Sequence, residues 1–107
     1  MNETYEAVFI IKDYKDTEKI KEIIKEIDEI VINEGYEIYN KKDYGTKNLA
    51  YEIRKEKKGY YYVINFRDIC KKKNAREKVR RNINTMEDVL VFIIIKNDNK
   101  EGRKYNE

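Results

Sequence analysis

An amphipathic helical pattern near the start of the chain most constrains how it can fold. Branched apolar residues recur at helical spacing, with lysine and glutamate between them. The apolar positions are Ile20, Ile23, Ile24, Ile27, Ile30 and Val31. Asp16 is a suitable N-cap and Gly35 a suitable C-terminal stop. The pattern predicts a helix of about five turns whose apolar stripe must pack against another layer of structure.

Strand-like segments flank this helix and continue after it. The segments rich in isoleucine, valine and tyrosine are 5–11, 36–44 with its continuation at 49–53, 60–66 and 89–95. Gly45 interrupts the second segment, where a glycine indicates a bulge or bend. We expect a charged hairpin turn at 55–59 and a basic helix over 71–83.

The resulting order is β-α-β-β-α-β. It predicts the ferredoxin-like fold of the α+β class, in which both helices cover one face of a four-stranded antiparallel sheet. We expect this domain to span 1–96 and to be followed by a polar, flexible tail over 97–107.

Side-chain alternation assigns each strand residue to one of the two faces of the sheet. Glu6 and Asn65 are polar, so we place them on the face without helices, and Phe9 and Tyr62 then face the core. The outward residues of three strands form an apolar set: Val8, Ile10, Tyr61, Val63, Val91, Ile93 and Ile95. Such a patch predicts a protein-partner surface. The alternative is ordinary strand sequence with tolerated exposed apolar residues.

Composition narrows the range of functions. Charged residues make up 42% of the 107 residues, and the net charge is +3. There is no histidine and only one cysteine, Cys70, so the commonest general base and a cysteine-based zinc site are both missing. We expect no cofactor, no metal site, no enzymatic activity, no membrane span and a cytoplasmic location.

The segment 58–65 (K-G-Y-Y-Y-V-I-N) nearly matches the first RNA-contacting box of RNA-recognition motifs, which have the same element order. In that register Tyr62 would stack on a base. The same register would bury Asn65, which costs about 1–3 kcal/mol without a hydrogen-bond partner. We therefore favour a core Tyr62. A stand-alone binder of single-stranded RNA remains an alternative.

The segment 71–81 is strongly basic. It contains one acid, Glu77, and these cations: Lys71, Lys72, Lys73, Arg76, Lys78, Arg80 and Arg81. This asymmetry favours a phosphate-facing surface. The alternative is an ordinary surface in a lysine-rich protein.

The stretch 45–55 reads G-T-K-N-L-A-Y-E-I-R-K. It resembles the G-x-[RK]-x-L-A-Y-P-I-x-K segment of the bacterial small-subunit ribosomal protein six family. Y-E at 5–6, G-Y at 59–60 and D-V at 88–89 fall in family positions as well, so the resemblance covers 5–96. The chain departs from the family pattern at Asn48, Glu52, Asn84 and Val91.

This resemblance implies a non-catalytic protein of the small ribosomal subunit. It implies binding to small-subunit rRNA together with small-subunit ribosomal protein eighteen as a heterodimer partner. A small ferredoxin-like enzyme or regulator is a further alternative.

We expect the RNA contacts to come from the 45–55 region and the second helix. The candidate residues are Lys42, Lys47, Tyr51, Arg54, Lys55, Arg76, Arg80 and Arg81. The bend at Gly45 should project Lys47 off the sheet, and Leu49, Tyr51 and Ile53 should then anchor the strand again.

Overall fold

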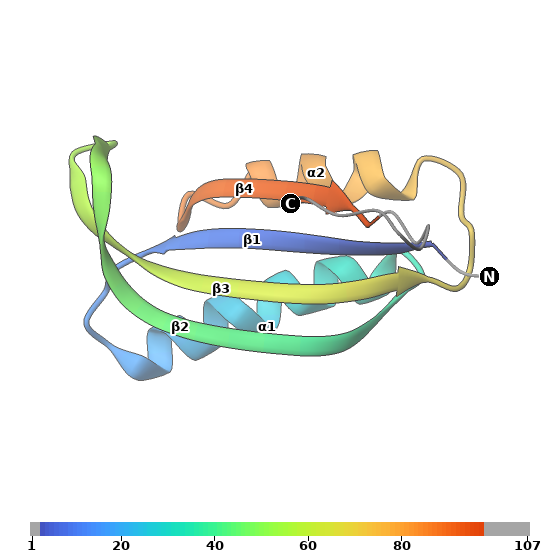
Figure 1. Cartoon of the computed structure of the whole chain (residues 1–107), viewed down its shortest axis with the longest axis horizontal. Coiled ribbons are helices and arrows are strands. Elements are labelled where there is room, and N and C mark those ends of the chain that lie inside the picture. Colours follow the sequence, from blue (N-terminus) through green and yellow to red (C-terminus); the bar gives the residue numbers. More distant parts are fainter. Residues whose placement is uncertain (1–2, 98–107) are drawn as a thin grey trace, which may run out of the picture.

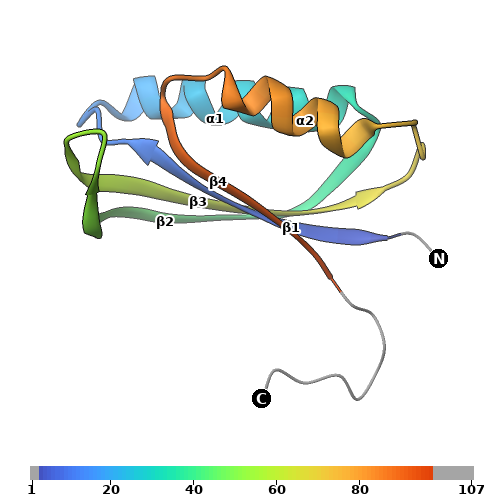
Figure 2. The same ribbon diagram turned by 90° about the horizontal axis from the view of Figure 1, so that it is seen from above.

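The computed structural model describes residues 3–97, which form one antiparallel sheet covered by helices on one face (Figures 1 and 2). The elements are β1 (Thr4–Lys12), α1 (Thr17–Asn33), β2 (Tyr36–Ile53), β3 (Glu56–Asp68), α2 (Ala75–Asn84) and β4 (Val89–Lys96). The strand order is β2-β3-β1-β4, and each neighbouring pair is antiparallel. The predicted ferredoxin-like fold is confirmed.

Helix α1 forms where the isoleucine pattern predicts it. The Asp16 carboxylate accepts hydrogen bonds from the backbone N–H groups of Glu18 and Lys19, at 3.0 and 3.4 Å. This caps donors that the first helical turn leaves unpaired. Gly35 has φ +90, a left-handed conformation that favours glycine and ends the helix.

The core lies between the sheet and the two helices. Every second residue of β1 is buried. The Phe9 ring stacks on Phe92 with 5.0 Å between centroids, and it lies 6.0 Å from the Tyr62 ring. Tyr62 itself is fully buried, as favoured above. The alternative in which Tyr62 stacks on RNA bases is therefore wrong.

The second helix begins later than expected, at Ala75 rather than residue 71. The backbone of Lys71 and Asn74 is left-handed, with φ of +54 and +61, so the chain cannot be helical through this segment. Asp68 accepts the Lys71 backbone N–H at 2.8 Å, which fixes the turn. Lysines 71–73 therefore precede the helix.

The β2–β3 hairpin turns at Arg54–Lys55, and the predicted turn at 55–59 is wrong. Both turn residues have positive φ, +49 and +67, as the tight turns that suit twisted hairpins require. The expected bulge at Gly45 is confirmed, because the β2–β3 register shifts between Asp43 and Gly45. Two further shifts lie between Ile38 and Asn40 and between Asn48 and Ile53.

The end of β4 is tied to β1. The Asn97 backbone N–H donates to the Thr4 carbonyl at 2.8 Å, so the first residue of the predicted tail is held by the sheet. The remainder of that tail, 98–107, lies outside the described residues. Within 3–97, neither helix has the length and apolarity needed to cross a membrane.

Candidate nucleic-acid and protein interface

The open face of the sheet carries the apolar patch that alternation predicts. Its cross-strand rows are Val91–Ile10–Tyr61 and Ile93–Val8–Val63. Ile93 and Ile95 on the edge strand are 49% and 51% exposed. Val63 belongs to the same face but is only 7% exposed, and its cross-strand neighbours there are Val8 and Lys42. The expected partner face is therefore one surface, with Val63 as its floor rather than a contact residue.

Leu49 extends this patch from the hairpin. Gly59 lies on β3 beneath it, and a Cβ at Gly59 would come within 2.4 Å of Ile10 Cγ2 and 3.4 Å of Leu49 Cδ2. The missing side chain lets the hairpin bring Leu49 against the end of the patch. Leu49 is accordingly half-buried.

The predicted cations of β2 lie on the open face beside the patch. Lys42 pairs with Val63 in the β2–β3 register, so it faces away from the helices. Lys47 does not project off the sheet as expected. Its Nζ lies over aromatic rings, 5.3 Å from the Tyr44 centroid and 5.9 Å from the Tyr61 centroid. The two lysines border the patch on its β2 side.

The hairpin tip is docked through Arg54. Its guanidinium donates to the backbone carbonyls of Glu87 and Val89 at 3.2 and 3.0 Å, and the tip curves toward the start of β4 (Figure 1). The Arg54 guanidinium thus binds the backbone of this chain rather than projecting freely. Tyr51 is 81% exposed, so the expectation that it anchors the strand is wrong. Lys55 is also exposed.

Helix α2, which carries the other predicted cations, lies in the helical layer (Figure 2), whereas Lys42 and Lys47 face the open side of the sheet. Arg80 and Arg81 are exposed. The Arg76 guanidinium lies 5.5 Å from the Tyr5 ring centroid. The predicted RNA-binding residues therefore form three groups: Lys42 and Lys47; Tyr51, Arg54 and Lys55; and Arg76, Arg80 and Arg81.

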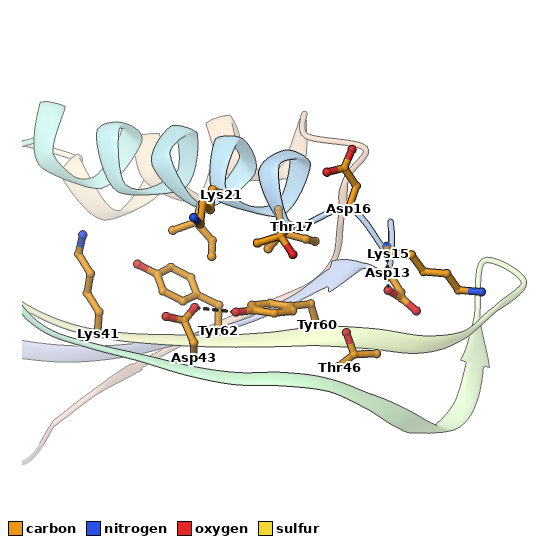
Figure 3. Close-up of a pocket in the computed structure, with 12 residues that line it drawn as sticks. Asp13, Lys15, Asp16, Thr17, Lys21, Lys41, Asp43, Thr46, Tyr60 and Tyr62 are labelled. Carbon is orange, nitrogen blue, oxygen red and sulfur yellow. Dashed lines mark hydrogen bonds between the residues drawn. The ribbon is translucent and has the colours of Figure 1, made fainter.

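A cleft of about 500 Å³ opens between the start of α1 and the β2–β3 edge (Figure 3). Its acids already have partners. Asp43 accepts the Tyr60 hydroxyl at 3.0 Å, Asp13 accepts the Lys15 backbone N–H at 3.1 Å, and Asp16 caps α1. No nucleophile paired with a general base lines this cleft. Residues 3–97 also contain no cluster of three potential metal ligands.

A buried polar network next to this cleft was not predicted. Asp28 is only 6% exposed. Its carboxylate accepts the Tyr62 hydroxyl at 2.8 Å and pairs with Lys41 Nζ at 2.8 Å. Burial, followed by this hydrogen bond, raises the pKa of Tyr62 above its ordinary value. One signal was available, because Asp28 lies four residues after Ile24 and three before Val31, at the edge of the apolar stripe.

Known proteins are similar to this chain in sequence and fold. The family model described as Ribosomal protein S6 matches residues 4–96. The small ribosomal subunit protein bS6 of Helicobacter hepaticus is 38% identical over 97 residues, which are 91% of this chain and 69% of that protein. The Helicobacter acinonychis protein of the same name is 42% identical over 91% of this chain and 66% of its own length.

A solved structure agrees with the fold. The crystal structure of 30S ribosomal protein S6 from Thermotoga maritima superposes with a TM-score of 0.81 at 22% identity, covering 91% of this chain and 89% of that one. The family match over nearly all the described residues confirms the resemblance carried by residues 45–55. This chain belongs to the ribosomal protein S6 family of the small ribosomal subunit.

Proposed function

We propose that this chain binds small-subunit rRNA and, through the open face of its sheet, small-subunit ribosomal protein eighteen. One observation carries the proposal. A continuous apolar patch on the open face is bordered along β2 by Lys42 and Lys47, which have no carboxylate partner among residues 3–97. Apolar surface suits a protein partner, and free cations suit phosphates.

The protein partner would cover the half of the open face farthest from β2. Ile93 and Ile95 lie on the edge strand β4, and about half of each side chain is exposed. Apolar side chains at such a position gain most from burial against a second protein. Leu49 would meet the same partner from the hairpin side.

The RNA would contact the molecule mainly through its phosphates. Lys42 and Lys47 on β2 and Lys55 at the hairpin tip are exposed, so they can approach a backbone without rearrangement. Arg54 would contribute by holding the tip in place, because two carbonyls already occupy its guanidinium. Folded rRNA is recognised largely by shape and backbone, which fits cations spread over an extended surface.

A salt titration tests the RNA half of the proposal. The full chain, with protein eighteen present, is titrated onto a small-subunit rRNA fragment at several salt concentrations. With about four phosphate contacts, log K should fall against log salt with a slope of about −3 to −4. Replacing both Lys42 and Lys47 by alanine should make that slope shallower by about 2. Lys25→Ala, on exposed α1 surface, is the matched control.

The same assay has an arm for the protein partner. Ile93→Glu places a charge on the open face at a half-exposed position and should weaken the binding of protein eighteen by about tenfold or more. Ile32→Glu makes the same change on α1, where Ile32 is 52% exposed, and should have no such effect. Salt-independent affinity, or no rRNA binding with the partner present, would refute the proposal.

A further inference from the structure

We infer that the open-face edge along β2 is a stacking platform for unpaired nucleotides of the RNA. The platform consists of Tyr39 and Tyr44, with Arg67, Lys42 and Lys47 beside them. The inference rests on the proposed function, because it assumes that this edge meets rRNA. It adds that the edge prefers an unpaired RNA segment and that it holds this segment by base stacking.

The tyrosines of the platform contribute little to the core. Tyr39 and Tyr44 are 44% and 49% exposed, whereas Tyr5, Tyr36 and Tyr62 are buried. Single exposed aromatic side chains are common on protein surfaces and need no explanation. Here two of them lie on one edge strand, about 16 Å apart at the usual rise per strand residue. That spacing is too large for one base, so each ring would receive a base of its own.

Each ring of the platform lies next to a cation. The Arg67 guanidinium carbon is 4.3 Å from the Tyr39 ring centroid. Lys47 Nζ is 5.3 Å from the Tyr44 centroid, and Lys42 lies between the two tyrosines in the sequence, on the same open face. Glu37 lies 3.2 Å from Arg67 Nε and offsets part of the charge at that end. The Lys42–Lys47 end remains cationic.

This combination suits a single strand rather than a duplex. Proteins that bind single strands pair cations, which follow the phosphates, with aromatic rings on which bases stack. A duplex keeps its base faces covered and can offer this edge only phosphates. The helical side of β2 lacks such an arrangement, because Lys41 pairs with buried Asp28 there and Asp43 holds the Tyr60 hydroxyl.

The platform and the apolar patch can be occupied at the same time. The strand order β2-β3-β1-β4 places Tyr39 and Tyr44 at one edge of the sheet and Ile93 at the other. Tyr61 and Lys47 lie where the two surfaces meet. A protein on the β4 half would leave the β2 half free for RNA.

The test compares the full-length chain with its variants on two RNA probes. One probe is a fluorescently labelled oligouridine, and the other is a blunt duplex with the same number of nucleotides. Tyr39→Ala and Tyr44→Ala should each weaken binding to the single strand by about five- to a hundredfold. Tyr39→Phe and Tyr44→Phe retain the stacking ring and should stay within about twofold of the wild type. Ile32→Ala removes a similarly exposed apolar side chain from α1 and should change nothing.

Several results would overturn the inference. If the alanine variants bind the single strand as tightly as wild type does, base stacking on Tyr39 and Tyr44 does not contribute to binding. Equal losses in the alanine and phenylalanine variants would assign the contact to the hydroxyl groups, and equal losses on the duplex would assign it to phosphates. Weaker binding of protein eighteen with unchanged RNA binding would make this edge a protein contact.

Parallel binding to a small-subunit rRNA fragment separates this inference from the proposed function. If wild type binds the fragment with the expected salt dependence and the alanine variants match it on both fragment and oligouridine, only the inference fails. If wild type does not bind the fragment with protein eighteen present, the proposed function fails and the inference fails with it. Thermal melts of all variants check that they are folded.

Discussion

The two faces of the sheet use the same residue type for different purposes, and neighbouring tyrosines of β3 make the comparison direct. Tyr62 points toward the helices, is fully buried, and donates its hydroxyl to Asp28 at 2.8 Å. Tyr61, one residue earlier, points to the open face and lies 5.9 Å from Lys47 Nζ. Strand register, rather than residue type, decides which tyrosine supports the fold and which is available to a partner.

The difference extends to the polar groups of each face. On the helical side, the buried carboxylate of Asp28 is matched by Lys41. On the open side, Lys42 and Lys47 have no carboxylate partner within 3–97, and apolar side chains such as Ile93 remain half exposed. Paired polar groups and buried side chains stabilise the chain on its own. Unpaired cations and exposed apolar side chains contribute favourable free energy only when a partner binds them.

Replacing the two tyrosines separately is the most direct test of the contrast between the two faces. Tyr62→Ala should reduce the free energy of unfolding by about 3–5 kcal/mol, because it leaves a core cavity. Tyr61→Ala should cost about 1 kcal/mol or less, since its side chain is partly exposed. Chemical denaturation measures both values. A Tyr62→Ala protein with wild-type stability and lost RNA binding would contradict the assignment of the two faces.

A second substitution tests how tightly the open face is packed where the hairpin meets it. Gly59→Ala would bring a methyl group within 2.4 Å of Ile10 Cγ2 and should lower the free energy of unfolding by about 1–3 kcal/mol. Adding Ile10→Ala should recover part of that loss, a coupling that a double-mutant cycle measures. If Gly59→Ala alone leaves stability unchanged, the close packing of Ile10, Gly59 and Leu49 is wrong.

The buried tyrosines predict that alkaline pH lowers the stability of the fold, by less than the Tyr62→Ala substitution does. Burial is the main cause that raises the pKa of Tyr5 to about 12, and burial also raises the pKa of Tyr62, whose phenolate would lie beside Asp28. A pKa raised in the folded state means that the unfolded chain ionises first. Stability is therefore fully retained below about pH 10, the unfolded value, and falls as pH rises toward 12.

At pH 11 each such tyrosine should cost about 1 kcal/mol. Urea unfolding at pH 8 and pH 11 measures the total, and Tyr62→Phe should lose less stability over this interval than wild type does. Equal losses in the two proteins would mean that Tyr62 ionises as readily when folded as when unfolded.

The sequence predicts the parts of the fold that depend on local periodicity. The isoleucine spacing locates α1, and alternation assigns the faces of β1 and β3 correctly, because both signals depend only on which side chains reach the core. The split of the RNA candidates into three groups could not be predicted in this way. It depends on how the hairpin curves and on which layer α2 occupies.

The errors have physical causes that a local pattern does not contain. Gly59 suggested a turn, but it lies within β3. The strand has a glycine at this position because Ile10 and Leu49 fill the space where a side chain would be. The turn uses Arg54 and Lys55 in left-handed conformations that their residue types do not favour. The lysines before α2 are good helix formers, yet Asp68 and the Gly35 carbonyl hold the chain in a turn there. Tertiary contacts override propensity at each of these positions.

The Arg54 contact has a mechanical consequence for the sheet. β2 and β4 are its two outer strands, and Arg54 ties the end of the β2–β3 hairpin to the connection that leads into β4. One end of the sheet is thus held together across its full width. Whatever binds the hairpin also holds the start of β4, so the RNA binding proposed at one edge and the protein binding proposed at the other would share a physical link.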